Sequence, residues 1–240
     1  MDLNGKVILV VGGAAGIGGA TVALCAARGA TVVAADLDEA QGRQTAAQAG
    51  ASFIQVDVTD EASVQALARQ VEQEHGRVDV LIQTAGILLG AYTPIEELSA
   101  ETFEKVWRVN VTGTFLCLKY TTPLLKRSSK AVVLLFSSPA ANLPSSSYAY
   151  GASKGGVQAF GIAAAQKLGE AGIRVNLIAP GGIDTGMKRS VIAEDARRRG
   201  TDYDKAIASS NLGAPEGVAK VLAWLASDDA DYVRGLVATR

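Results

Sequence analysis

The sequence is poor in the residue types that mark several protein classes. It has one histidine and two cysteines among 240 residues, and aromatic residues make up 5% of the chain. Cys25 and Cys117 stand in apolar, helix-like stretches, which favours reduced core thiols over a disulfide framework or a metal site. His75 precedes a glycine at a helix end, where a solvated or capping role is expected. We therefore expect neither metal chemistry nor a Ser-His-Asp hydrolase.

Charge and long apolar runs are also scarce. The 23 basic and 24 acidic residues give a net charge of −1, which leaves no basic surplus for a nucleic acid or an anionic membrane. The longest apolar runs, such as residues 7–11 and 131–136, are far shorter than the ~20 residues of a membrane span. The first four residues do not begin a signal peptide. We expect a cytoplasmic protein with a small-molecule partner, without nucleic acid or membrane.

Short β-branched runs alternate with longer segments of helical period. The runs are nearly continuous in apolar residues, which is typical of parallel strands covered by helices on both faces. The predicted strands are residues 6–11, 30–35, 52–56, 78–83, 131–136 and 173–178, with a short seventh at 235–239. The predicted helices are residues 17–28, 40–48, 60–75, 101–126, 150–170 and 216–226.

Capping residues support these boundaries. Thr59 or Asp60 and Ser99 are placed as N-caps, and Pro215 suits the first turn of the last helix. No linker of domain-joining length appears, and residues 187–212 form one long, charged, irregular insertion. We predict an α/β fold, a doubly wound parallel sheet in a single domain over residues 1–240, with a lid segment at about residues 186–213.

Glycines gather directly after the first predicted strand. Gly12, Gly16 and Gly18 stand where the strand ends and the helical pattern begins. Glycines there allow positive φ, let backbone N–H groups approach a diphosphate, and let the helix pack close to the sheet. Glycine-rich loops also serve as plain tight turns, so the context must decide between a turn and a phosphate site.

An acidic residue at the end of the second strand supplies that context. Asp36 lies eighteen residues beyond Gly18, close to the spacing expected for the acid that bonds the adenosine ribose hydroxyls. Its charge would repel a 2′-phosphate, and no Arg or Lys at positions 14, 15 or 37 compensates. The sequence therefore favours NAD over NADP.

A tyrosine and a lysine stand four residues apart at the start of a predicted helix. Tyr150 and Lys154 should share one helix face. A free phenol has a pKa of about 10, and an adjacent cation favours its ionised form. Tyr150 is thus a candidate to exchange a proton with a substrate hydroxyl or carbonyl.

Taken together, these motifs resemble the short-chain dehydrogenase/reductase family along nearly the whole chain. The resemblance implies a Rossmann fold and places four catalytic residues in order, Asn110, Ser138, Tyr150 and Lys154. The implied cofactor-binding residues are Gly12, Gly16, Ile17, Gly18, Asp36, Asp57, Val58, Ala85, Gly86, Tyr150, Lys154, Ile183 and Thr185.

The resemblance also implies a function. The chain would be an NAD-dependent oxidoreductase that passes a hydride between nicotinamide and a secondary alcohol or ketone. Tyr150 would transfer the proton, Lys154 would lower its pKa and bond the nicotinamide ribose, and Ser138 would hold the substrate oxygen. Asn110 would hold a water that links Lys154 to solvent. A homo-oligomer, a dimer or tetramer, would form through helices 101–126 and 150–170.

The chain departs from the family pattern at four places. Val11 stands where Thr is usual, and Gln83-Thr84 where Asn-Asn is usual, so we expect altered local hydrogen bonding with cofactor binding retained. The spacing from Ser138 to Tyr150 is one residue short, so Ser137 competes for the serine role. The last four residues lack the usual Val-Asp-Gly-Gly tail, which bears on the last strand and its subunit contacts.

Two alternative functions also fit the sequence: a catalytically idle NAD-binding regulatory domain, and an epimerase or dehydratase of the same fold. Arg197-Arg198-Arg199 is interpreted as a solvated face. The mostly apolar positions predicted to face the substrate are Leu88, Leu89, Ala140, Asn142, Leu143, Tyr148, Gly182 and Met187.

Overall fold

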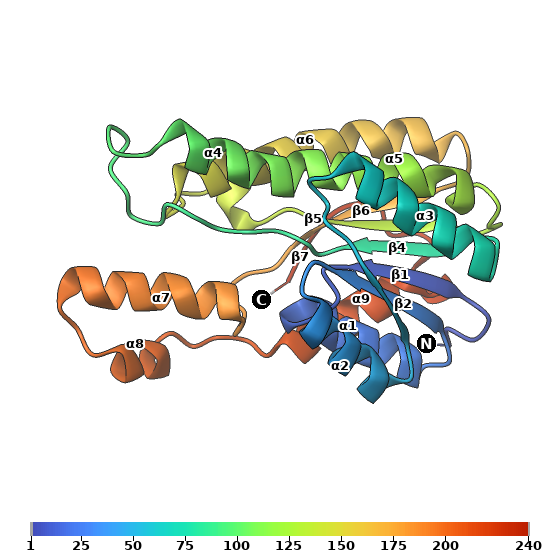
Figure 1. The fold of residues 1–240 in the computed structure, drawn as a ribbon, viewed down its shortest axis with the longest axis horizontal. Coiled ribbons are helices and arrows are strands. Elements are labelled where there is room, and N and C mark those ends of the chain that lie inside the picture. The colour runs from blue at the N-terminus through green and yellow to red at the C-terminus, as the bar shows by residue number, and fades with distance from the viewer. Residues whose placement is uncertain (1, 240) are drawn as a thin grey trace.

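A seven-stranded parallel sheet forms the centre of the computed structural model, which describes residues 2–239 (Figure 1). Its strand order is β3-β2-β1-β4-β5-β6-β7, and each neighbouring pair is parallel. The strands are β1 (Val7–Val11), β2 (Thr31–Asp36), β3 (Ser52–Gln55), β4 (Val80–Gln83), β5 (Val132–Phe136), β6 (Arg174–Ala179) and β7 (Gly235–Ala238). The predicted doubly wound sheet is confirmed, and its order reverses between β1 and β4.

Helices cover both faces of this sheet. Helices α3 to α6 lie on one face, α1, α2 and α9 lie on the other, and α7 and α8 project beyond the carboxyl ends of the strands (Figure 1). The helices are α1 (Gly16–Ala27), α2 (Glu39–Ala49), α3 (Glu61–His75), α4 (Ala100–Trp107), α5 (Gly113–Leu125), α6 (Tyr148–Gly169), α7 (Gly186–Arg199), α8 (Tyr203–Ser209) and α9 (Pro215–Ala226).

Two hydrophobic clusters, one on each face, bury the sheet. Leu9 and Leu81 belong to the cluster under α3 to α6, whereas Ile8 and Ile82 belong to the cluster under α1 and α9. Successive side chains of a strand point to opposite faces, so a strand covered on both faces has to be apolar throughout. This explains the continuous apolar runs in the sequence.

The predicted helix at residues 101–126 is interrupted by a turn of π-helix. The π turn, Arg108–Thr112, joins α4 to α5 and carries Asn110. Ser99 caps α4 as predicted, and Asp60, one of the two candidates, caps α3 by accepting a hydrogen bond from Ala62 N at 3.0 Å. Single π turns inside helices are frequent at functional sites.

The prediction of an irregular segment at residues 187–212 is wrong, because this segment forms α7 and α8. Thr185 caps α7 by accepting a hydrogen bond from Lys188 N, and Asp202 caps α8. On α7, Arg197 pairs with Glu194 at 2.7 Å one turn away. The segment has no apolar stripe, so apolar periodicity did not predict its helices. These helices are stabilised by N-caps and side-chain ion pairs instead.

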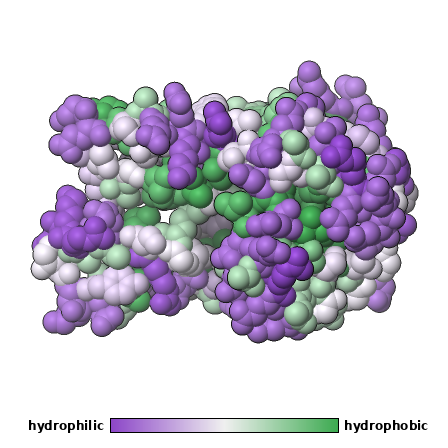
Figure 2. Space-filling model, viewed as in Figure 1, coloured by the Kyte–Doolittle hydropathy of each residue, from purple (hydrophilic) through white to green (hydrophobic). Residues whose placement is uncertain are grey.

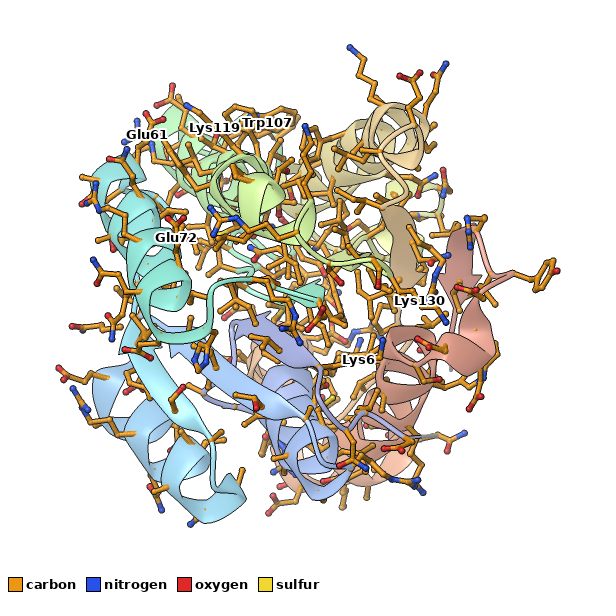
Figure 3. The ribbon with its side chains drawn as sticks, turned by 90° about the vertical axis from the view of Figure 1, so that its right-hand side faces the viewer. Lys6, Glu61, Glu72, Trp107, Lys119 and Lys130 are labelled. Atoms are coloured by element: carbon orange, nitrogen blue, oxygen red, sulfur yellow. The ribbon has the colours of Figure 1, made fainter. Side chains whose placement is uncertain are left out.

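Charged side chains fasten the sheet at the edge opposite the carboxyl ends of the strands. Lys6 and Lys130, labelled in Figure 3, both donate to Asp228, at 2.9 and 2.8 Å. At another corner Glu61 of α3 meets Lys119 of α5 at 2.6 Å (Figure 3). Over residues 2–239, the helices are too short or too polar to cross a membrane.

Candidate active site

A cleft of ≈ 1250 Å³ opens at the carboxyl ends of the strands. It runs from the glycine loop after β1, past the ends of β2, β4 and β5, to the start of α7. Figure 2 shows the hollow near the middle of the molecule, bordered by apolar residues. This is the position at which open parallel sheets bind ligands, the crevice where the strand order reverses.

The glycine loop has a geometry that glycine alone permits. Gly12 and Gly16 have φ of +86° and +56°. A Cβ on Gly12 would overlap Ala85 N, and a Cβ on Gly18 would overlap Gly12 O. Ala15, the N-cap of α1, offers no side-chain acceptor, so no side chain caps the first-turn N–H groups facing the cleft. Loop and helix end therefore fit a diphosphate.

Thr84 compensates for the missing threonine at position 11. Its hydroxyl donates to Val11 O at 2.8 Å and lies 3.0 Å from Gly12 O. The loop after β1 is thereby tied to the end of β4 from the neighbouring strand. Gln83 is buried, and among the described residues its side-chain amide finds no hydrogen-bond partner.

Asp36 ends β2 with both carboxylate oxygens engaged by backbone N–H groups. One oxygen accepts from Ala14 N at 3.0 Å and the other from Asp38 N at 3.1 Å. Asp36, Leu37 and Asp38 all line the cleft. Within residues 2–239, the basic side chains lining the cleft lie on other elements, and they are Lys105, Arg108, Lys154 and Lys188. The corner after β2 thus presents negative charge.

Two of the residues implied to bind the cofactor, Asp57 and Val58, lie beside this corner. Asp57 accepts hydrogen bonds from the backbone and hydroxyl of Thr59, at 2.8 and 2.7 Å, which fixes the turn after β3. Val58 is buried against Gly113 at the start of α5. Asp57 and Val58 line the cleft, as Ala85 and Gly86 do.

Tyr150 and Lys154 both enter the cleft from the first turns of α6. Ser147 caps this helix by accepting from Tyr150 N at 3.1 Å. The Lys154 ammonium lies 5.5 Å from the centre of the Tyr150 ring and donates to Phe136 O at 2.8 Å. The two residues therefore share one face, as their spacing predicted.

Of the two candidate serines, the structure brings Ser138 to Tyr150. The side chains of Ser138 and Tyr150 are hydrogen-bonded. The hydroxyl of Ser137 instead lies 3.2 Å from Gln158 Oε1 and 3.3 Å from Lys154 O. The adjacent serines point different ways, as side chains of extended backbone do.

The protonation of this pair differs from expectation. Burial raises the pKa of Tyr150, and the hydrogen bond from Ser138 offsets this in part. Burial also lowers the pKa of Lys154 to about 8. The expected lowering of the tyrosine pKa by Lys154 is not found, because the ammonium bonds Phe136 O and the phenol is desolvated. At neutral pH the phenol keeps its proton and can donate it.

The side-chain amide of Asn110 joins two elements of the site, and its implied role in holding a water beside Lys154 stays a prediction. Its Oδ1 accepts from Ile87 N at 2.8 Å, and its Nδ2 donates to Ile87 O and Ser153 Oγ, both at 2.9 Å. The amide therefore joins the loop after β4 to α6, one residue before Lys154. The side chain is committed to these partners, so its observed role is to position them.

Ile183 and Thr185 bring the start of α7 to the glycine loop. Ile183 is buried and forms an isolated parallel bridge with Gly213. A Cβ built on Gly16 would lie 3.2 Å from the Thr185 methyl group. Both residues line the cleft. Among residues 2–239 there is no group of three or more His, Cys, Asp or Glu side chains arranged to hold a metal ion.

Some of the positions predicted to face the substrate line the cleft. Leu88, Ala140 and Met187 line the cleft. Asn142 pairs with Gln158, and the remaining predicted positions, Leu89, Leu143, Tyr148 and Gly182, are not among its lining residues.

Two contacts beside the cleft were not predicted from the sequence. Gln158 contacts the serine segment, and Arg198 stacks over the Tyr92 ring at 4.8 Å while also pairing with Asp195. Gln158 follows Lys154 at the same interval of four residues that separates Lys154 from Tyr150. This spacing was the sequence signal that could have placed Gln158 on the same helix face. Nothing in the sequence pairs Tyr92 with Arg198.

Comparison with known proteins agrees with this geometry. A family model described as enoyl-(acyl carrier protein) reductase matches residues 12–239. A protein named short chain dehydrogenase/reductase astE, from Aspergillus oryzae, is 34% identical over 98% of this chain and 92% of its own length. (+)-Borneol dehydrogenase 1 from Salvia officinalis is 33% identical over 98% of this chain and 91% of its own. The crystal structure of levodione reductase superposes with a TM-score of 0.88 at 30% identity, covering 98% of this chain and 96% of its own.

Proposed function

This chain belongs to the short-chain dehydrogenase/reductase family and is an oxidoreductase, and we propose that it uses NAD to interconvert a secondary alcohol and its ketone. The observation that carries the proposal is the hydrogen-bonded pair of Ser138 and Tyr150, set beside Lys154 in a cleft that continues to the glycine loop. One compartment thus joins a proton donor to a phosphate site.

The residues divide the chemistry between them. Nicotinamide, when bound, supplies or accepts the hydride. Tyr150 donates its phenolic proton to the carbonyl oxygen of a ketone, and takes a proton from the hydroxyl of an alcohol in the reverse direction. Ser138 donates a hydrogen bond to the same oxygen. Asn110 holds Ile87, which directly follows Gly86, and Ser153, which directly precedes Lys154.

The cofactor would be held mostly by backbone groups and by Asp36. The N–H groups of the glycine loop and of the first turn of α1, including Ile17, would bind the diphosphate. Asp36 would accept from the adenosine ribose, and Val58 and Ala85 would border the adenine. Ile183, through its backbone, and Thr185, through its hydroxyl, would hold the carboxamide.

The preference for NAD rests on charge. Asp36 and Asp38 line the same corner, so a 2′-phosphate there would meet two carboxylates. Like charges in such a position cost several kcal/mol, so we expect NAD to bind at least about tenfold more tightly than NADP. Fluorescence titration of both cofactors measures this ratio, and Asp36→Ala should reduce it. Equal affinity of the wild type for the two would refute the preference.

The substrate is proposed to be an alcohol or ketone with an apolar body. Leu88, Met187 and Val191 line the cleft, and Ser138 and Tyr150 are the polar groups proposed to hold the substrate oxygen at its catalytic end. Among the relatives, a borneol dehydrogenase and a levodione reductase bear names of this kind. Apolar walls with few polar groups bind by burial and orient through the polar ones.

A panel of apolar secondary alcohols, followed by the absorbance of reduced nicotinamide, tests the function. Tyr150→Phe should lower kcat by about 10²–10⁴ while NAD binding stays the same, because the phenylalanine lacks the proton but keeps the ring. A wild type that binds NAD without any turnover would instead support a regulatory domain. Substrate conversion without net reduction of NAD would support an epimerase or dehydratase.

We also propose a homo-oligomer that works in the cytoplasm. The surface of α4, α5 and α6 exposes Phe103, Trp107, Phe115 and Ile162, of which Trp107 is labelled in Figure 3. Apolar side chains gathered on adjacent helices favour association with a second copy. Light scattering measures the assembly, and a monomer would contradict it. The free, buried thiols of Cys25 and Cys117 are consistent with a reducing compartment, which cell fractionation tests.

A further inference from the structure

Three residues on one stripe of α6 grip a single short segment. Tyr150, Lys154 and Gln158 follow one another at intervals of four, so they lie along one face of the helix. The first bonds the side chain of Ser138, and the second donates to Phe136 O at 2.8 Å. Gln158 reaches the same segment one turn further along.

Gln158 bonds both ends of the piece of chain that contains Ser138. Its Oε1 accepts from Ser137 Oγ at 3.2 Å and from Asn142 Nδ2 at 3.1 Å. Its Nε2 lies 3.5 Å from Asn142 Oδ1, which completes an amide-to-amide pair. Ser137 is 2% exposed, so water does not compete at that end.

Between these two ends lies a tight turn with Ser138 at its start. The serine is extended, with φ of −166°, and its hydroxyl accepts from Ala140 N at 3.2 Å as the cap of the 3₁₀ turn Pro139–Ala141. Asn142 is exposed and Ser138 is half-buried. The direction of the Ser138 hydroxyl therefore depends on how the turn is tethered to α6.

We propose that Gln158 is a positioning residue that keeps the Ser138 hydroxyl aimed at Tyr150 and at the substrate oxygen. This inference rests on the proposed function. Gln158 would be a fifth residue of the site beside the four implied catalytic residues. It does not touch the reacting atoms and acts through Ser137 and Asn142. We call the hydrogen bonds of Gln158 to Ser137 and Asn142 the clamp. One face of α6 thus carries the proton donor, the cation and the clamp on three successive turns.

Three substitutions separate positioning from folding. Gln158→Met keeps the length of the side chain and removes its hydrogen bonds. Asn142→Ala removes the other end of the clamp at an exposed position, where no core packing is lost. Gln166→Met is the matched control, because Gln166 lies on the same helix and is exposed.

We expect both clamp variants to lower kcat by about tenfold while the Kd for NAD stays within about twofold, since the glycine loop is untouched. The pH at which alcohol oxidation reaches half its maximum should rise, because a displaced Ser138 no longer bonds the ionised phenol. The double variant should cost less than the two single losses multiplied, since both remove one contact.

A readout independent of catalysis uses hydrogen exchange of the protein without cofactor. The amides of Ala141 and Asn142 donate to Ser138 O and Pro139 O inside the turn. They should exchange about tenfold faster in Gln158→Met and Asn142→Ala, and at the wild-type rate in Gln166→Met.

The outcomes distinguish this inference from the function beneath it. If Tyr150→Phe retains full activity, the proposed function fails. If Tyr150→Phe is inactive while Gln158→Met and Asn142→Ala match Gln166→Met in kcat, pH midpoint and exchange, the function stands and the positioning role is refuted. A loss of kcat with unchanged pH midpoint and unchanged exchange also refutes it.

Discussion

The cofactor wall and the lid wall of the cleft are each stabilised by a different kind of interaction. On the cofactor wall, the loop from Gly12 to Gly18 is fixed by its own backbone geometry and by Thr84, in contact with the buried sheet. On the lid wall, α7 carries exposed ion pairs within the helix, such as Arg197–Glu194, the stacking of Arg198 over Tyr92, and two buried side chains, Val191 and Ala196. Exposed ion pairs each contribute about 0–1 kcal/mol.

The difference indicates where change is tolerated. A wall made of backbone in close contact leaves no room for another side chain, so we expect substitutions there to abolish binding. A wall made of weak, solvent-exposed pairs can be altered at little cost, so we expect substitutions there to adjust substrate affinity.

Gly18→Ala is the most severe test of the cofactor wall. The added Cβ would overlap Gly12 O, so the loop must shift. We expect NAD to bind at least about 100-fold more weakly by fluorescence titration. Gly186→Ala is the matched control on the lid wall, because a Cβ there has no atom within 4 Å among the described residues. Equal effects of the two would remove the contrast.

The pH dependence of turnover tests the state of Tyr150. Because its pKa is raised, the phenol is protonated at neutral pH and only a small fraction is ionised. Oxidation needs the ionised form, so kcat for an alcohol should rise about tenfold per pH unit between about pH 6 and pH 8. Reduction uses the protonated form and should stay flat over that range. Parallel profiles for the two directions would contradict the assignment.

Thr84→Val should have an intermediate effect. Valine keeps the shape and removes the hydroxyl that bonds Val11 O and Gly12 O. A lost hydrogen bond of this kind is worth about 0.5–1.5 kcal/mol, so NAD should bind about two- to tenfold more weakly. Thr84→Ser retains the hydroxyl and serves as the control. If Val and Ser variants bind NAD alike, the hydroxyl does not support the loop.

Arg198→Ala should have the smallest effect. It removes the stacking on Tyr92 and the pair with Asp195, both at the surface. We expect KM for the alcohol to rise about two- to threefold, with the free energy of unfolding changed by less than about 1 kcal/mol in urea. Arg197→Ala, which breaks an ion pair without a ring contact, should leave KM unchanged. A large loss of stability would show that the lid is part of the core.

The sequence predicted the cofactor wall better than the lid wall, because the two walls are stabilised by different interactions. Continuous apolar strands and glycines at the end of β1 record local constraints, so the sheet and the loop could be predicted from them. The helices α7 and α8 are stabilised by caps and charges, which resemble an irregular segment in sequence. Gln158 was missed because its partners lie sixteen or more residues away.

The protonation of the tyrosine also lay beyond sequence reasoning. The spacing of Tyr150 and Lys154 predicted their shared face correctly. It carried no information on burial, which raises one pKa and lowers the other. Nor did it show that the lysine ammonium is bound to a strand carbonyl.

The side-chain amide of Asn110 is a connection point shared by three segments that border this cleft. One buried side chain ties the loop after β4, the π turn and α6 to one another. A chimera that imports any one of these three pieces from a relative will inherit a mismatched fit at the connection point, whereas a chimera that imports all three together keeps it. The exchangeable unit for redesigning this enzyme is therefore the trio, and the boundaries for grafting follow its hydrogen bonds.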